Sequence, residues 1–157
     1  MIRLVPMLEG DLHSYLDTAI PNYAADNVKA GYWSEEEALG KSKDAYSKLL
    51  PEGVHSISQH LYKIEDTESG QSVGIIWLNA RVDAPHPSGF IYDIEVNEEF
   101  RGKGYGKQAM LAIEEKAREL GLKSIGLHVF AHNAVAKELY EKIGYEIKSN
   151  NMTKALD

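Results

Sequence analysis

The chain has 157 residues, 43% hydrophobic and 26% charged, which predicts one globular domain over residues 1–157 and excludes a disordered chain. Its 17 lysines and arginines against 24 aspartates and glutamates give a net charge of -7, which argues against binding to nucleic acid or an anionic membrane. Cysteine is absent, so disulfides, thiolate metal sites and a cysteine nucleophile are excluded.

The N-terminal segment predicts a strand and then a helix. Residues 2–5 form a short apolar strand, and residues 8–30 follow a helical pattern that Pro21 is expected to interrupt. Glu9 and Asp11 stand where a signal peptide needs its apolar region. We therefore expect a cytoplasmic protein.

A second helix and a hairpin follow. Ser34 and Glu37 have the spacing of a capping box at the start of this helix, which ends at residues 50–53. Residues 59–65 and 72–80 then predict two strands, because a polar loop that ends in glycine separates two largely apolar runs. These two strands are expected to form a hairpin.

The next predicted strand, residues 90–96, has two unlike faces. Side chains alternate between the two sides of a strand. One face is expected to carry Phe90, Tyr92, Ile94 and Val96, and the other Ile91, Asp93 and Glu95.

The last third of the chain predicts two helices and further strands. A helix runs to Leu120 and is capped by Gly121, and residues 124–130 form a strand. Residues 133–143 form a helix that Gly144 ends. Its expected core face carries Val135, Leu139 and Ile143. Residues 145–156 are expected to supply one or two closing strands.

The strongest functional signal is residues 94–107, IEVNEEFRGKGYGK, in which a strand leads into a glycine-rich turn that opens a helix. The free amides at a helix start form an anion site with the positive end of the helix dipole, and glycines let a phosphate approach the backbone. Arg101, Lys103 and Lys107 add three cations in an otherwise acidic protein. The segment therefore predicts a phosphate site.

Two well-known phosphate loops do not match this segment. A dinucleotide-binding fingerprint needs G-x-G-x-x-G, whereas the glycines here occupy every second position, and residues 124–130 carry no carboxylate. A Walker A loop needs serine or threonine after Gly-Lys, and Lys107 is followed by Gln108. Both interpretations fail.

A second segment, residues 133–145 (NAVAKELYEKIGY), follows after a single strand. Together with the glycine-rich loop it resembles the GNAT superfamily of N-acetyltransferases, closely over residues 91–145 and in element order elsewhere. The acetyl-CoA motif of that superfamily is Gln or Arg, two residues, Gly, one residue, then Gly or Ala, and Arg101, Gly104 and Gly106 match it. The resemblance implies an α/β fold with a mixed, twisted sheet of six or seven strands and helices on both faces.

The resemblance also implies acetyl-CoA as co-substrate, with its pantetheine arm between two splayed parallel strands that end near Val96 and Phe130. The loop amides would hold the pyrophosphate, Asn133 would contact pantetheine, and Tyr140 would protonate the departing CoA thiolate. The residues that the resemblance assigns to acetyl-CoA are Ile94, Glu95, Val96, Arg101, Gly102, Lys103, Gly104, Tyr105, Gly106, Lys107 and Asn133.

A general base must take a proton from the attacking amine. Some members of the superfamily carry a carboxylate where this chain has Tyr92, which is no base near pH 7. Others, similar to protein N-terminal acetyltransferases, carry a glutamate where this chain has His128, and histidine suits the task. His128 is the candidate base, or else a polar partner inside the sheet. Asp93 and Glu95 are further candidates.

No metal site is predicted, because His128 and His132 straddle a strand end and lack the adjacent glutamate of a helical zinc motif. Tyr32 and Trp33 form either a buried anchor or part of the acceptor pocket, which the connection between the first two helices borders in the superfamily.

The expected reaction is acetyl transfer from acetyl-CoA to a primary amine of a small molecule. Direct attack is expected, since cysteine is absent and no activated serine is visible. The alternatives are a protein α-amine or lysine as acceptor, and a non-catalytic acyl-CoA-binding module. A homodimer is frequent in the superfamily, but no motif in this chain names its oligomeric state or its acceptor.

Overall fold

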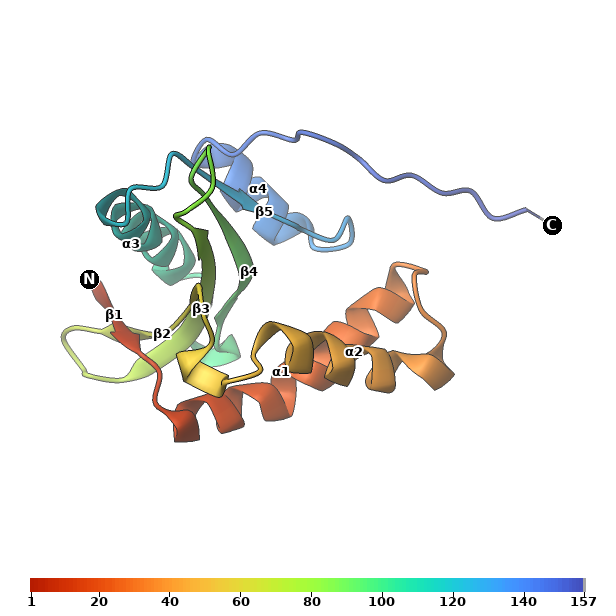
Figure 1. The fold of residues 1–157 in the computed structure, drawn as a ribbon, viewed down its shortest axis with the longest axis horizontal. Helices are drawn as coiled ribbons and strands as arrows, with labels where there is room; N and C mark the ends of the chain where they lie inside the picture. The colour runs from red at the N-terminus through yellow and green to blue at the C-terminus, as the bar shows by residue number, and fades with distance from the viewer. Residues whose placement is uncertain (157) are drawn as a thin grey trace.

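The protein is an α/β structure in which one mixed sheet lies between two pairs of helices (Figure 1). The computed structural model describes residues 1–156. The sheet order is β1-β2-β3-β4-β5, with β4 and β5 parallel and all other pairs antiparallel. The strands are β1 (Ile2–Pro6), β2 (Gln59–Asp66), β3 (Ser72–Arg81), β4 (Ser88–Val96) and β5 (Ser124–Leu127). The helices are α1 (Glu9–Lys29), α2 (Glu35–Leu49), α3 (Tyr105–Glu119) and α4 (Ala134–Lys142).

Each face of the sheet buries its own apolar cluster. On one face, α1 and α2 cover Trp77 of β3, which is 1% exposed, and neighbouring side chains of β2. On the other face, α3 and α4 cover Ile76 and Leu78, which alternate with Trp77 along the same strand. β3 is the central strand of the sheet and is buried on both faces, so most of its residues are apolar.

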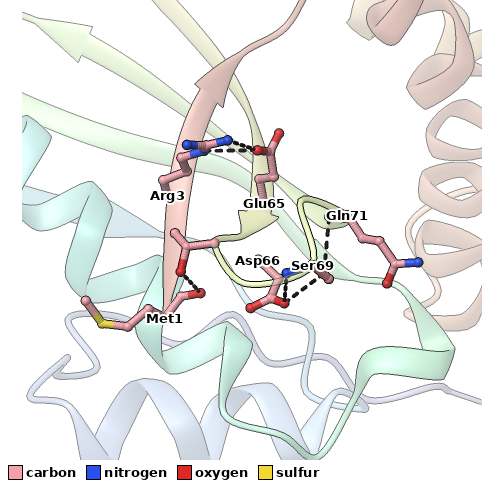
Figure 2. A network of polar contacts seen from close by, with 7 residues as sticks. Met1, Arg3, Glu65, Asp66, Ser69 and Gln71 are labelled. Carbon is pink, nitrogen blue, oxygen red and sulfur yellow. Dashed lines mark hydrogen bonds and ion pairs between the residues drawn. The ribbon is translucent and has the colours of Figure 1, made fainter.

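The far edge of the sheet is tied by polar contacts between β1 and β2 (Figure 2). Arg3 pairs with Glu65, which stands directly opposite it in the antiparallel register. In the following turn, Asp66 accepts a hydrogen bond from the backbone of Ser69 at 3.1 Å. This network lies at the opposite edge from β4 and β5, so it stabilises the sheet without entering the site described below.

The sheet has five strands among residues 1–156, so the expectation of six or seven is wrong. Residues 145–156 form no strand, and the chain after Tyr145 extends away from α4 (Figure 1). The strand expected over residues 124–130 is also shorter, because β5 ends at Leu127. Both differences concern the same edge, where β5 has β4 on one side and no strand on the other.

The helix boundaries agree with most of the sequence signals, with one correction. The Ser34 hydroxyl accepts a hydrogen bond from the backbone of Glu37, which confirms the predicted cap of α2. However, α1 continues through Pro21, where an interruption was expected. Proline has no N–H, so the backbone carbonyl of Asp17 lacks its usual helical partner at Pro21. Both residues are exposed, so water can donate a hydrogen bond to that carbonyl.

The core face of α4 is also displaced from the expected one. Val135 is 83% exposed, whereas Ala136, Leu139 and Ile143 pack against the core. A spacing of four residues drifts around a helix of 3.6 residues per turn, so a stripe that contains positions 139 and 143 reaches 136 rather than 135 one turn earlier. No helix within residues 1–156 has the length and apolarity that a membrane crossing requires.

Candidate active site

The parallel strands β4 and β5 separate after a short ladder. Their pairing runs from Ser88 opposite Ser124 to Ile91 opposite Leu127 and then stops. β4 continues to Val96 while it remains paired with β3. Alternate residues of an antiparallel strand point their backbone groups to opposite sides, so this part of β4 has unpaired groups on the side of β5. The result is a gap between the ends of the two strands.

A β-bulge in β4 changes which side chains face the helices α1 and α2. The register shifts between Trp77 and Leu78 of β3, so Tyr92 is the extra residue in β4. Asp93 stands opposite Trp77, and the centres of the Tyr92 and Trp77 rings are 5.0 Å apart. Tyr92, Asp93 and Glu95 therefore share the α1/α2 face, and Ile94 joins the opposite core. The expected alternation, which placed Asp93 and Glu95 opposite Tyr92, is wrong.

The glycine-rich loop joins the end of β4 to the start of α3. Gly102 and Gly104 have φ of +77° and +84°, in the left-handed region where a side chain is strained. Gly104 is the N-cap of α3, so the amides of Tyr105, Gly106 and Lys107 have no carbonyl partner within the helix. Three free amides at the positive end of a helix dipole suit an anion such as phosphate.

The three cationic side chains of this loop make different contacts. The Arg101 side chain donates to the backbone carbonyl of Val96 at 2.8 Å and lies 3.9 Å from Glu95, so it fixes the end of β4. The Lys103 ammonium lies 5.9 Å from the centre of the Phe100 ring. Lys107 lies exposed in the first turn of α3. Lys103 and Lys107 are the cations that are available to a bound phosphate.

Helix α4 carries two further residues that the resemblance singles out, Asn133 at its start and Tyr140 near its end. Asn133 is the N-cap residue of α4, and its side chain makes no capping hydrogen bond. Tyr140 is buried, and the centre of its ring lies 6.2 Å from the centre of the Tyr145 ring. Burial, with a smaller contribution from the negative charge of Asp93, raises the pKa of Tyr140 to about 12. Tyr140 therefore keeps its proton at neutral pH.

Asp93 is the centre of a polar cluster to which helices α1 and α2 contribute tyrosines. The Tyr15 hydroxyl of α1 donates to its carboxylate at 2.5 Å. Its negative charge raises the pKa of Tyr15 and Tyr46 beyond the effect of their burial, and it also acts on Tyr140. Burial raises the pKa of Asp93 to about 6, a change that the Tyr15 hydrogen bond opposes and the charge of Glu95 increases.

Sequence reasoning gave Asp93 only a secondary place and missed its tyrosine partners. Tyr15 and Tyr46 come from two different helices and carry no motif, so no spacing along the chain could reveal that they meet. The available signal was a carboxylate among the apolar residues of this strand, because a buried charge needs partners.

His128 lies just beyond β5 and is exposed. The centre of its ring lies 4.8 Å from the centre of the Phe130 ring, in an edge-on arrangement. The centre of the Phe130 ring lies 6.5 Å from that of Tyr23 in α1. The side chains of residues 125, 127 and 129 pack against the opposite core, so the alternation of this segment places His128 on the α1/α2 face. The structure thus puts His128 and Asp93 on one side of the sheet and Tyr140 on the other side.

Aromatic rings continue this face between α1, α2 and the sheet. Trp33 packs edge-on against Tyr23, with 5.5 Å between the ring centres, and Tyr23 packs against Tyr46. Tyr46 in turn contacts Trp77. Trp33 is therefore part of this packed aromatic row, whereas Tyr32 is 44% exposed and accepts a hydrogen bond from Asn151.

Comparison with known proteins agrees with this geometry. The model of the acetyltransferase (GNAT) family matches residues 28–145. The uncharacterised N-acetyltransferases YycN and YdgE of Bacillus subtilis are 40% and 37% identical, over 99% and 98% of this chain and 99% and 97% of theirs. The crystal structure of YycN superposes with a TM-score of 0.95 over 99% of both chains.

A more distant relative is the mycothiol acetyltransferase of Propionibacterium freudenreichii. It is 32% identical over 90% of this chain, which spans 44% of its length. The family model covers most of the chain and the relatives are similar over nearly all of it, so this protein is a member of the acetyltransferase (GNAT) family.

Proposed function

We propose that the protein transfers the acetyl group of acetyl-CoA to a primary amine of a small molecule. The amine nitrogen attacks the thioester carbonyl directly, the carbon–sulfur bond breaks, and the amide and free CoA are the products. The single observation that carries this proposal is the end of the β4–β5 pairing at Ile91 and Leu127, while β4 continues to Val96 and leads into the free amides at the start of α3.

The residues around the gap fit acetyl-CoA. The amides of residues 105–107 and the cations of Lys103 and Lys107 would hold its phosphates. Backbone groups of Ile94, Glu95 and Val96 on the side that β5 leaves unpaired would hydrogen-bond the pantetheine arm, apart from the Val96 carbonyl, which Arg101 already occupies. The side chain of Asn133, which makes no capping hydrogen bond, would contact the arm from α4. Arg101 supports this arrangement indirectly, because it holds the end of β4.

Substituting Gly104 with valine is expected to abolish the stabilisation that acetyl-CoA gives. The position needs φ of +84°, which a β-branched residue strains, and the loop must leave room for a phosphate. A ligand at 100 times its Kd stabilises the native state by about 2.7 kcal/mol, which thermal melting detects.

The matched control for this variant is Gly121→Val. Gly121 lies at the other end of α3, with φ of +83° and no atom near its missing Cβ. Both variants should lose intrinsic stability, but only Gly104→Val should lose the melting shift with acetyl-CoA. An equal shift in the two variants would contradict the assignment of the loop.

Proton transfers complete the proposed reaction. Tyr140 donates its proton to the sulfur of the departing CoA, and the base takes a proton from the amine nitrogen. We assign the base to His128, which lies on the α1/α2 face beside the gap. Asp93 is the strongest competitor because it lies on the same face, with Glu95 and bulk water as further ones.

His128→Gln is expected to reduce turnover about tenfold and to leave acetyl-CoA affinity unchanged. The effect is smaller than for most positioned bases because water can also accept the proton. The measurement is the pH–rate profile, whose acidic limb should shift in this variant. His132→Gln, which alters the other histidine that contacts Phe130, is the control. An unchanged acidic limb would transfer the role to Asp93, Glu95 or water.

The acceptor class is inferred from the α1/α2 face. Its aromatic row and the carboxylates of Asp26, Asp93 and Glu95 offer apolar contact and negative charge, which suit a cationic amine. One relative carries the name mycothiol acetyltransferase, which refers to a compound rather than to a protein. This supports a small-molecule acceptor over a protein α-amine or lysine.

A panel of amines, amino sugars and peptides tests the proposal by release of free CoA. The chain has no cysteine, so a thiol reagent reports CoA without background from the protein. Turnover of small amines at rates above those of peptides is the expected result. Faster turnover of peptides would favour a protein acceptor, and binding of acetyl-CoA with no turnover would favour a non-catalytic binding module.

A further inference from the structure

Four aromatic side chains on the α1/α2 face lie outside the core of the protein. We call them the aromatic platform, and they are Phe90 and Tyr92 of β4, Tyr23 of α1, and Phe130 in the segment after β5. Tyr92 is 38% exposed and Tyr23 is 36% exposed. Within residues 1–156, the two apolar clusters of the sheet include none of the four rings. The platform therefore leaves apolar ring surface in contact with water.

The platform crosses from β4 to the chain after β5 at the point where the two strands separate. The centres of the Phe90 and Tyr92 rings are 5.2 Å apart. Phe90 stands opposite Gly126 of β5, and a Cβ at Gly126 would lie 3.6 Å from the Phe90 ring. The Phe90 ring thus lies over the backbone of β5. Tyr92 directly follows the last residue of β4 that pairs with β5, so the platform borders the opening of the gap.

The carboxylate of Asp93, which follows Tyr92 in β4, lies among other negative charges. The charged side chains that act on it most, Glu95 and Asp26, are both acidic, and Glu95 and Asp26 both raise its pKa. The Tyr15 hydroxyl donates a hydrogen bond to this carboxylate but does not neutralise its charge. A buried charge is stabilised by an opposite charge. A cationic ligand would therefore supply the partner that these neighbouring side chains do not.

We propose that the acceptor is an arylalkylamine, whose planar ring stacks on the aromatic platform and whose ammonium group pairs with Asp93. This inference rests on the proposed function, because it names the substrate class of the same site. A planar ring matches exposed aromatic rings, whereas the hydroxyl groups of an amino sugar would lose water against them. A polyamine has no ring to cover the platform. Once the base has removed its proton, the nitrogen beside Asp93 attacks the thioester carbonyl.

The first test compares phenethylamine with cyclohexylethylamine, two amines of the same charge and chain length, by calorimetric titration of the full chain in the presence of CoA. CoA carries no acetyl group, so binding is measured without turnover. The Kd of phenethylamine is expected to be about fivefold lower, since an aromatic pair gains stability beyond the area that it buries. Glucosamine should bind more weakly than either amine. An equal or lower Kd for cyclohexylethylamine or glucosamine would overturn the proposal.

Removal of a ring tests whether the preference comes from the platform. Tyr92→Leu and Phe130→Leu each keep an apolar side chain without the ring, and each should bring the two Kd values within about twofold of each other. The matched control is Tyr32→Leu, because Tyr32 is 44% exposed and lies outside the platform. This control should keep the wild-type ratio. Thermal melting identifies the variants that fold, and a wild-type ratio in a folded ring variant would contradict the role of the platform.

Asp93→Asn tests the contact with the ammonium group. The variant should raise the Kd of both amines by about tenfold and leave their ratio unchanged, because a hydrogen bond to a charged group is among the stronger ones. Asp17→Asn, on the exposed side of α1, is the control and should bind both amines as the wild type does. If Asp93→Asn bound them with unchanged affinity, the ammonium group would have to lie elsewhere and the proposal would fail.

Release of CoA from acetyl-CoA with the same amines separates this inference from the proposed function. Selective binding of phenethylamine without its acetylation would support the platform and contradict acetyl transfer to this class of amine. Acetylation of other small amines without selective binding of phenethylamine would overturn the platform and leave acetyl transfer in place.

Discussion

Tyr140→Phe is expected to lower turnover by about 10²–10⁴-fold, the usual range for a positioned general acid. The substitution removes only the hydroxyl, and the ring that packs in the core stays in place. Affinity for acetyl-CoA should change little, because the proposed phosphate and pantetheine contacts come from other residues. The measurement is steady-state release of CoA with an acceptor identified in the amine panel, together with acetyl-CoA binding.

Tyr145→Phe is the matched control for this prediction. Tyr145 also packs in the core beside α4, but its hydroxyl donates to Glu114 at 3.2 Å on the α3 side. This variant should lose some stability and keep its turnover. If Tyr140→Phe retained more than half of the wild-type turnover while departure of the thiolate limited the rate, Tyr140 would be a packing residue. A series of thioester analogues with different leaving groups establishes which step limits the rate.

Asp93→Asn is expected to stabilise the protein at pH 8 and to have no such effect at pH 4. The pKa of Asp93 is about 6 in the folded protein, above its ordinary value of 3.8. A raised pKa means that stability is fully present below pH 3.8 and is lost as the pH rises through 6. At 1.36 kcal/mol per pKa unit, the ionised carboxylate costs about 3 kcal/mol at pH 8.

Asparagine avoids this cost because it carries no charge, and its side-chain oxygen can still accept the hydrogen bond from Tyr15. Unfolding by urea at several pH values measures the effect, with Asp17→Asn on the exposed side of α1 as control. The difference in unfolding free energy between variant and wild type should grow by about 3 kcal/mol from pH 4 to pH 8. A difference independent of pH would show that Asp93 titrates as an ordinary exposed carboxylate.

The sequence was most informative where a local rule decides the structure. The Ser34 cap, the glycine that ends α3 and the order of strands and helices all follow from contacts between residues close in the chain. The family was likewise apparent from two short segments, because the glycine-rich loop and the start of α4 each place backbone groups by local conformation.

The errors in the sheet and in the site arose where distant segments decide the structure. The bulge at Tyr92 depends on the register between β3 and β4, so no pattern within β4 alone could reveal it. The cluster around Asp93 needs helices α1 and α2 to be placed on the same face. Whether residues 145–156 pair as strands depends on where the chain after Tyr145 is directed, which no local pattern decides.

The bulge at Tyr92 also bears on how such a protein evolves. A strand of strict alternation would have directed Asp93 into the layer beneath α3 and α4, away from Tyr15 and Tyr46. One inserted residue reverses the assignment for the rest of β4 and leaves the β3 partner strand unaltered. Insertions and deletions in a sheet are commonly regarded as damage. Here the one extra residue of the bulge places both Asp93 and Glu95 on the face that α1 and α2 cover.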